Sequence, residues 1–286
     1  MAMTPIQKQR NSMNAMRVFK ASMVMALLAV IMLISFSCLH TQSQSLEEAE
    51  KINFIQYTLP DDDDTVVIFE TTMGTVKAVL FEEQAPKFCE YFKKLVNDGY
   101  YDGTYYFYIE DEQKAYAFAG GKAPDGNDTD DTDKEMLEPE KSNDLWPFRG
   151  ALCTFGREKG VFNKRNTTGS RILFVNSVVF DDDMINEMNE LDANEQLIKY
   201  FTEKGGVPNF SQQFTIFGQV YDGMDVVEKI NSAEVDENKK PKQEIKIISA
   251  KLSTYGENRS DNEEEAFPES FKSDDSAAEV DNSLVD

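Results

Sequence analysis

The sequence predicts a domain built mainly of β-strands, and two patterns in it indicate this. The first is a pair of alternating apolar runs, Thr65–Glu70 and Thr75–Phe81, separated by Met73-Gly74, which is the pattern of a β-hairpin. The second is Arg149–Asn176, in which two short apolar runs flank a long polar loop, again typical of two strands. Strands are therefore expected to supply most of the core.

Helices are expected at few places. Pro86 stands in a favoured first helical position, and the apolar residues after it fall on one helical face, namely Phe88, Cys89, Phe92, Leu95 and Val96. The stretch 181–208 has apolar residues at spacings that suggest one or two amphipathic helical pieces, namely Met184, Met188, Leu191, Leu197, Ile198 and Phe201.

The composition excludes several classes of function. The chain has 286 residues and a formal net charge of −23, and a surface this acidic repels phosphates, so no nucleic acid is expected among its partners. His40 is the only histidine and follows the N-terminal apolar run, which leaves no imidazole for a Ser-His-Asp or Cys-His nucleophile or a His-ligated metal. We expect Cys89 and Cys153 to be small buried side chains, although a disulfide between them stays open.

An acidic stretch, Asp125–Asp133, places oxygen-bearing residues at odd spacings, as calcium-binding loops do. An EF-hand register would require glycine where Asp130 stands and glutamate where Met136 stands, so the match fails. We interpret this stretch as a solvated acidic loop and predict no metal site.

The N-terminus has the features of an export segment. Basic residues precede an uncharged apolar run, Ala21–Ser37, and acidic residues follow it, so the positive-inside rule places the rest of the chain outside the cytoplasm. Cys38 ends the run in a context that resembles a lipoprotein processing site, although Ser35 stands where such sites usually have an aliphatic residue. Lipidation at Cys38, an uncleaved membrane anchor and ordinary secretion all stay open. In the first two cases the domain is tethered to the outer face of the cell membrane.

The domain organisation follows from these patterns. We predict a signal, lipoprotein or anchor segment over residues 1–38 and a polar acidic linker over 39–64. A folded domain over 65–255 carries insertions at 122–143 and 181–208, and the acidic tail over 256–286, which is poor in large apolar residues, is expected to be disordered.

Several motifs occur in the order in which one enzyme family has them. Val67–Thr104 contains "V-I-x-E-T-x-x-G", "L-F", "A-P-K" and "G-Y-Y-D-G-T", and the later motifs are Gly120-Gly121, Arg149-Gly150, Gly169-Ser170, Phe217–Val220 and Gly223–Ile230. From about Val66 to Leu252 the chain resembles the cyclophilins, which are peptidyl-prolyl cis-trans isomerases. The resemblance implies a closed eight-stranded antiparallel β-barrel capped by two helices, Pro86–Asn97 and Met224–Asn231, with the substrate groove on its outer wall.

The resemblance also implies a mechanism that needs no cofactor. The barrier is the partial double bond of the amide, about 18–20 kcal/mol. Cyclophilins lower it with an Arg donor beside an apolar proline pocket, which is electrostatic preorganisation. Here the position of that Arg holds Tyr108. A replacement donor is Arg171, on the neighbouring strand of the motif, with the Tyr108 hydroxyl assisting.

The other groove positions also depart from the family. The pocket Met and the backbone-holding Gln are replaced by Ala117 and Ala119, next to a retained aromatic residue, Tyr116. The remaining positions implied for the peptide groove are Phe155, Gly156, Leu173, Asn209, Phe210 and Phe214.

These replacements leave more than one function open. The groove is either rebuilt around Arg171 as a weak isomerase or binds proline-containing segments of exported proteins without accelerating isomerisation. A third possibility is an interaction module whose insertion or tail carries the contacts. We expect a monomer in each case, with a role in folding or holding exported proteins.

Overall fold

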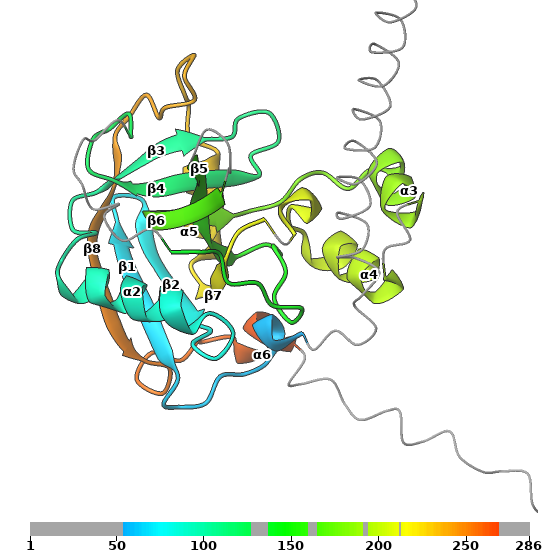
Figure 1. Ribbon diagram of the computed structural model, residues 1–286, viewed down its shortest axis with the longest axis horizontal. Coiled ribbons are helices and arrows are strands. Elements are labelled where there is room, and N and C mark those ends of the chain that lie inside the picture. Colours follow the sequence, from blue (N-terminus) through cyan, green and yellow to red (C-terminus); the bar gives the residue numbers. More distant parts are fainter. Residues whose placement is uncertain (1–53, 127–136, 160–164, 191–193, 212, 269–286) are drawn as a thin grey trace, which may run out of the picture.

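In the part of the chain that the computed structural model describes, residues 54–126, 137–159, 165–190, 194–211 and 213–268, eight strands form one closed barrel (Figure 1). Around the barrel the order is β1-β2-β7-β5-β6-β4-β3-β8, and each neighbouring pair is antiparallel. The strands are β1 Thr65–Thr71, β2 Gly74–Leu80, β3 Tyr105–Ile109, β4 Tyr116–Gly121, β5 Ala151–Lys159, β6 Arg165–Val175, β7 Ile216–Asp222 and β8 Ile245–Thr254. The expected barrel is confirmed.

The hairpin between β1 and β2 shows how local sequence sets the register. The last pair of the ladder is Thr71 with Gly74. The Thr71 hydroxyl donates to the Gly74 carbonyl at 2.6 Å and accepts from the Met73 N–H at 3.1 Å, which closes the turn. Gly74 has φ of +140°, and a Cβ there would lie 2.7 Å from Val226. Only glycine therefore fits where the hairpin meets the next helix.

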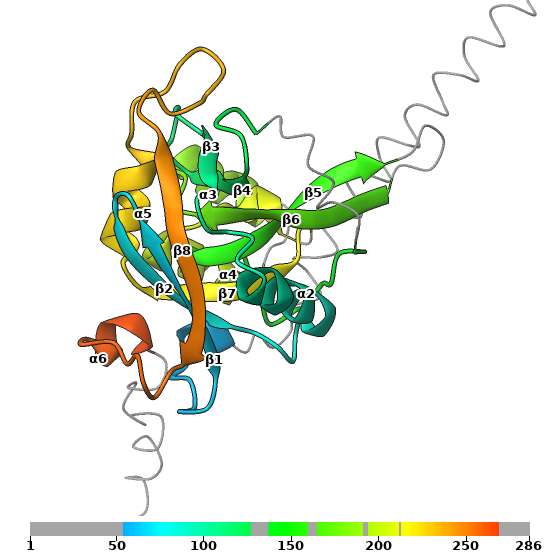
Figure 2. The same ribbon diagram turned by 90° about the vertical axis from the view of Figure 1, so that its left-hand side faces the viewer.

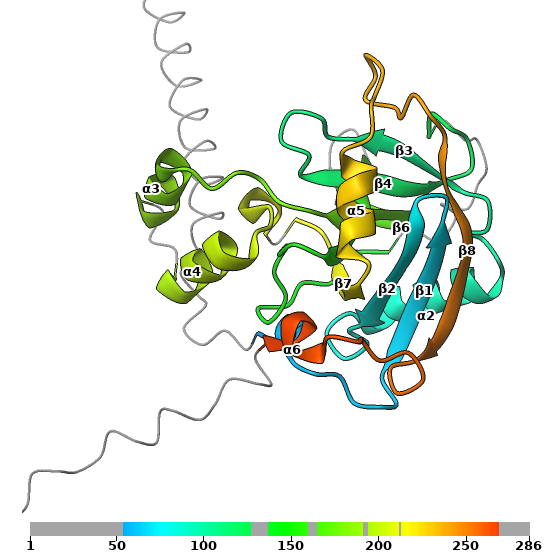
Figure 3. The same ribbon diagram turned by 180° about the vertical axis from the view of Figure 1, so that it is seen from behind.

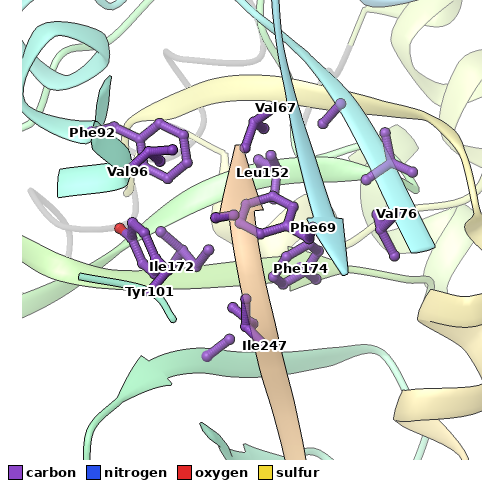
Figure 4. Close-up of a cluster of buried hydrophobic side chains, with 14 of the residues drawn as sticks. Val67, Phe69, Val76, Phe92, Val96, Tyr101, Leu152, Ile172, Phe174 and Ile247 are labelled. Carbon is purple, nitrogen blue, oxygen red and sulfur yellow. The ribbon is translucent and has the colours of Figure 1, made fainter. Parts of the chain in front are cut away.

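The barrel interior is filled by side chains that alternate inward along the strands. Figure 4 shows Val67, Phe69, Val76, Leu152, Ile172, Phe174 and Ile247 in this core. Helices α2 (Pro86–Asn97) and α5 (Met224–Asn231) lie on opposite sides of the barrel (Figures 1 and 3) and bury one face each in the same core. Both helices have the bounds expected from the resemblance.

Glu140 supplies the N-terminal cap that α2 lacks in its own sequence. Ala85 at the N-cap makes no side-chain hydrogen bond, and the first turn contains no acidic residue. The Glu140 carboxylate instead accepts from the N–H groups of Lys87 at 3.2 Å and Phe88 at 2.8 Å. The insertion predicted at 122–143 is thus fastened to the barrel at its far end. Residues 127–136, which include most of the predicted acidic loop Asp125–Asp133, lie outside the described part.

The two cysteines are unpaired and buried on opposite sides of the barrel wall. Cys89 belongs to the interior core and Cys153 to a cluster on the outer side. The disulfide that the sequence left open is therefore absent, because the wall separates the two sulfur atoms. Burial raises the pKa of Cys89 to about 12 and also raises the pKa of Cys153, so both thiols stay protonated at neutral pH.

The insertion at 181–208 is helical, as predicted. It contains α3 (Asp182–Glu190) and α4 (Glu195–Lys204), which lie beside the barrel in Figure 1 and behind it in Figure 2, and a 3-10 turn, η3 (Pro208–Phe210), begins at its last residue. Its buried side chains form an aromatic-rich cluster with residues from two other segments, namely Met188, Leu197, Tyr200 and Phe201 with Tyr57, Trp146 and Phe148. Of the predicted apolar face, Met184 and Ile198 are half-buried, and Leu191 lies outside the described residues.

The predicted linker over 39–64 is wrong from residue 54 onward. Residues 55–57 form a 3-10 turn, η1 (Ile55–Tyr57), and Gln56 is only 1% exposed. Phe54 stacks on Tyr200 of α4 with 3.4 Å between ring centroids. The acidic run Asp61–Asp64 suggested a solvated spacer, but the aromatic residues before it complete the cluster under the insertion.

The predicted disordered tail over 256–286 is also wrong for the residues described, which extend to 268. The segment contains a short helix, α6 (Glu263–Ala266), and Phe267 is fully buried. The Phe267 ring packs against Tyr221 and Tyr255, with centroids 5.8 and 5.6 Å away. This apolar contact, together with the hydrogen bond from the Tyr221 hydroxyl to the Asn258 carbonyl at 2.9 Å and the ion pair between Arg259 and Asp62, holds an otherwise acidic segment on the barrel.

The predicted export segment, with Ala21–Ser37 and Cys38, falls outside the described residues. Within those that are described, the structure contains no helix with the length and apolar character needed to span a membrane.

Candidate functional site

Several of the predicted site residues lie on the outer wall of the barrel, around β4 and β6. Along β6, Ile172 and Phe174 point into the interior core, so Leu173 between them faces outward. Leu173 pairs with Phe118 of β4, and Tyr116 pairs with Val175. Tyr116, Phe118 and Leu173 consequently share the outer face.

Five aromatic rings lie on this face, and we call them the aromatic row: Tyr108, Tyr116, Phe118, Phe210 and Phe214. Each is half-buried and therefore partly open to solvent. The ring centroids of Tyr108 and Phe118 are 5.1 Å apart, and those of Phe118 and Tyr116 are 5.4 Å apart. Tyr116 meets Phe210 at 5.0 Å, and Phe210 meets Phe214 at 5.1 Å. The row joins β3 and β4 to the segment after η3 in one continuous apolar surface.

Tyr116 is the most perturbed titratable group in the row. Burial, followed by the neighbouring Tyr108 and Glu110, raises the pKa of Tyr116 to about 12. Its phenol therefore keeps its proton at physiological pH and can donate a hydrogen bond. The hydroxyls of Tyr108 and Tyr116 are hydrogen-bonded to each other and are the polar groups of the row.

Arg171 lies on the same wall, but its guanidinium is already engaged. The side chain is 8% exposed, donates to the Gly126 carbonyl at 2.5 Å and stacks over the Phe107 ring at 5.1 Å. These contacts fasten the start of the 122–143 insertion against the barrel. In this arrangement the predicted donor is directed at the protein's own backbone.

Two of the predicted groove residues are on the wrong face. Ala117 and Ala119 are fully buried in the interior core, where they pair with Phe174 and Ile172. Ala117 and Ala119 alternate along β4 with Tyr116 and Phe118, and the β4–β6 ladder has no register shift over these residues, so the two alanines face the interior. The predicted groove places the consecutive residues Tyr116 and Ala117 on one face, which this alternation does not allow. Period-two alternation from Tyr116 identifies Phe118, which the prediction missed.

The remaining predicted residues are only partly brought together. Phe210 and Phe214 belong to the row, whereas Asn209 is exposed beside it and its carbonyl accepts from the Gln213 side chain. Gly156 pairs with Thr168 just after a register shift in the β5–β6 ladder. The side chain of Phe155 lies outside the described part of the structure.

The described surface also has two cavities, and both lie away from the aromatic row. Two cavities of about 510 and 530 Å³ lie beside Asp61–Asp64 and between α4, α5 and α6, and no ring of the aromatic row lines either of them. Among the described residues, no group of three or more His, Cys, Asp or Glu side chains is arranged to hold a metal ion.

Comparisons with known proteins show which family the chain resembles. A family model described as "Cyclophilin type peptidyl-prolyl cis-trans isomerase/CLD" matches residues 66–252. A Staphylococcus saprophyticus protein named "Putative peptidyl-prolyl cis-trans isomerase" is 28% identical over 192 residues, which cover 65% of this chain and 90% of that protein. A protein of the same name from Staphylococcus aureus strain COL is 28% identical over 189 residues, covering 64% and 89%. A crystal structure of a Cryptosporidium parvum cyclophilin type peptidyl-prolyl cis-trans isomerase covers 67% of this chain and 98% of its own, with 20% identity and a TM-score of 0.48.

Proposed function

This chain belongs to the cyclophilin-type peptidyl-prolyl cis-trans isomerase family, and on that premise we propose that it binds proline-containing segments of exported proteins on its aromatic row. We further propose that it accelerates their isomerisation weakly or not at all. The observation that carries the proposed binding is the row itself, in which five partly open rings occupy the outer wall. The proposed weak turnover is supported by the sequence resemblance, which aligns Tyr108 with the family's Arg position. Apolar walls with few polar groups favour ligand binding.

The expected weakness in turnover comes from the missing cationic donor. When the prolyl amide twists, its nitrogen loses conjugation and becomes a hydrogen-bond acceptor, so a well-placed donor stabilises the transition state. Removing one such donor from an enzyme typically costs about 10²–10³-fold in rate. Arg171 is directed at Gly126, and a phenol hydroxyl such as that of Tyr116, which keeps its proton, is a weaker donor than a guanidinium.

We also propose that the protein works outside the cytoplasm. The basic N-terminus, the apolar run Ala21–Ser37 and Cys38 support export followed by tethering at the outer face of the membrane. Membrane fractionation of cells expressing the full chain or Cys38→Ser tests this. Release of the variant into the soluble fraction would support lipidation, and retention of both would support an uncleaved anchor. Recovery of both chains in the cytoplasm would refute export.

The activity test is two-dimensional NMR exchange on an Ala-Pro-type tetrapeptide. We expect the full chain to shift the peptide resonances while producing weak or no exchange cross-peaks. Phe210→Ala should lose the shifts. Tyr108→Arg should gain exchange cross-peaks, because it returns a guanidinium to the row.

The same experiment includes Arg171→Ala as the decisive control. Strong exchange in the unaltered chain that disappears in Arg171→Ala would show a relocated donor and a working isomerase, and would refute the proposed weak turnover. Absence of peptide shifts in the unaltered chain would refute binding at the row.

A further inference from the structure

The aromatic row extends over several rings, whereas a single prolyl bond needs one pocket. We propose that its ligand is a segment already in the polyproline II conformation, with prolines three residues apart and all peptide bonds trans. This inference rests on the proposed function, because it names the class of proline-containing segment that the same surface selects.

The rings of the aromatic row differ in their orientation relative to one another. Tyr108 lies nearly parallel to Tyr116, with 15° between the planes and 6.2 Å between centroids, and is 28° from Phe118. Tyr116 and Phe118 are tilted by 39°. Phe210 meets Tyr116 at 61°, and Phe214 meets Phe210 at 89°. The contacts therefore range from stacked at Tyr108 to edge-on at Phe214, so the row offers several ring surfaces in different orientations against which pyrrolidine rings can pack.

The length of the aromatic row also matches several residues of a polyproline II segment. The three steps from Phe118 to Tyr116, Phe210 and Phe214 measure 5.4, 5.0 and 5.1 Å between centroids. A polyproline II helix rises about 3.1 Å per residue, so the path along these rings corresponds to at most roughly five residues of it. The same helix has about three residues per turn, so prolines at positions i and i+3 point to the same side. Two prolines at that spacing are about 9 Å apart, which is less than the length of this path.

The row can also supply a hydrogen-bond donor to such a segment. A polyproline II segment has no internal hydrogen bonds, and its carbonyl groups need donors. The hydroxyls of Tyr108 and Tyr116 are the polar groups within the row; they are hydrogen-bonded to each other, so one of the two O–H groups donates within the pair and the other can donate to the ligand. Proline has no N–H, so such a ligand places little demand on acceptors. A preformed conformation also loses less entropy on binding than a flexible chain does, as for other aromatic-lined surfaces that bind proline-rich segments.

The conformation has a consequence for isomerisation. Polyproline II requires trans bonds, so a surface that selects it binds the trans isomer of the ground state. Binding then shifts the cis–trans population without speeding the exchange. The cis fraction of an unfolded X-Pro peptide is roughly 10–30%, which is large enough to follow by NMR.

The test compares three blocked eight-residue probes titrated into the full chain: Ala-Ala-Pro-Ala-Ala-Pro-Ala-Ala, the same peptide with its second proline replaced by alanine, and a peptide with prolines four residues apart. We expect the first probe to bind at least about tenfold more tightly than the other two. Its cis fraction should fall at saturation.

Matched variants locate the interaction. Phe210→Ala should reduce the affinity for the first probe to that for the single-proline probe. Tyr108→Phe keeps the ring and removes one donor, so it should weaken binding about three- to tenfold. Ile248→Ala removes an apolar side chain of similar kind that is 56% exposed on β8, outside the row, and should change nothing.

The outcomes separate this inference from the function on which it rests. Equal affinity for all three probes, or an unchanged cis fraction at saturation, would overturn the polyproline II inference and leave proline-peptide binding intact. Failure of all three probes to bind would overturn both. If Phe210→Ala unfolds, Tyr108→Phe decides, and unchanged affinity in that variant would count against the row.

Discussion

Replacing Gln56 by leucine should destabilise the whole domain, although this residue lies in a segment whose sequence suggests a linker. The Gln56 side chain donates to the Trp146 carbonyl at 2.9 Å and to the Gln219 side-chain oxygen at 2.8 Å, and it accepts from the Trp146 N–H at 2.7 Å. Gln219 in turn donates to the Arg149 carbonyl at 2.8 Å. Gln56, Trp146 and Gln219 are all nearly inaccessible to solvent.

The magnitude follows from what leucine leaves behind. Leucine has a similar size but no polar atoms, so the Trp146 N–H and the Gln219 side-chain oxygen stay buried without this partner, whereas the Trp146 carbonyl still accepts from the Phe148 N–H at 2.7 Å. A buried polar group left unsatisfied costs about 1–3 kcal/mol. We therefore expect Gln56→Leu to lower the free energy of unfolding by about 3–5 kcal/mol in total. In urea this corresponds to a midpoint on the order of 1–2 M lower.

The assay is urea unfolding of the full chain followed by circular dichroism. Gln196→Leu is the matched control, because it makes the same change on the exposed face of α4 and should leave the midpoint within about 0.3 M. If Gln56→Leu unfolds at the same urea concentration as the unaltered chain, the segment 54–60 is not part of the cooperative unit and the reasoning is refuted.

Two further perturbations test other contacts of the fold. Glu140→Ala removes the acceptor at the start of α2 and should cost about 0.5–2 kcal/mol, which lowers the melting temperature by a few degrees. Glu90→Ala, on the exposed face of the same helix, should leave it unchanged, and equal melting temperatures would contradict the cap. Tyr116 has a pKa raised to about 12, whereas an unfolded tyrosine titrates near 10. Its stabilising contribution is therefore complete below about pH 10 and is lost as the pH rises toward 12, because the unfolded state releases its proton first. Tyr116→Phe should lose less stability over that range in alkaline unfolding experiments, and an identical pH dependence would rule the effect out.

Much of the barrel could be predicted because its elements carry local patterns. The β1–β2 hairpin shows period-two alternation around a turn, and α2 shows an apolar face at helical spacing after Pro86. The insertion at 181–208 likewise showed helical spacing and formed α3 and α4. Each of these patterns depends on residues close together in the chain, so sequence alone contains the information.

The candidate site was predicted less completely, because matching motifs residue by residue does not say which face of a strand each residue occupies. Tyr116, Leu173, Phe210 and Phe214 were identified and do lie together. The pair Ala117 and Ala119 was assigned to the outer wall and lies inside, because these residues alternate along β4 with Tyr116 and Phe118, which face outward.

The sequence by itself determined the strand-rich domain, its two principal helices and its family, since repeating local patterns and ordered motifs encode them. Tertiary structure alone decided which residues close the domain. Gln56 meets Trp146 across 90 positions, Glu140 meets Phe88 across 52, and Phe267 fills a site beside Tyr221 and Tyr255. These are single residues whose stabilising partners are distant in sequence. Composition alone predicts that the segments around Gln56, Glu140 and Phe267 are acidic and solvated. Each of these residues contacts its buried partner only in the folded domain.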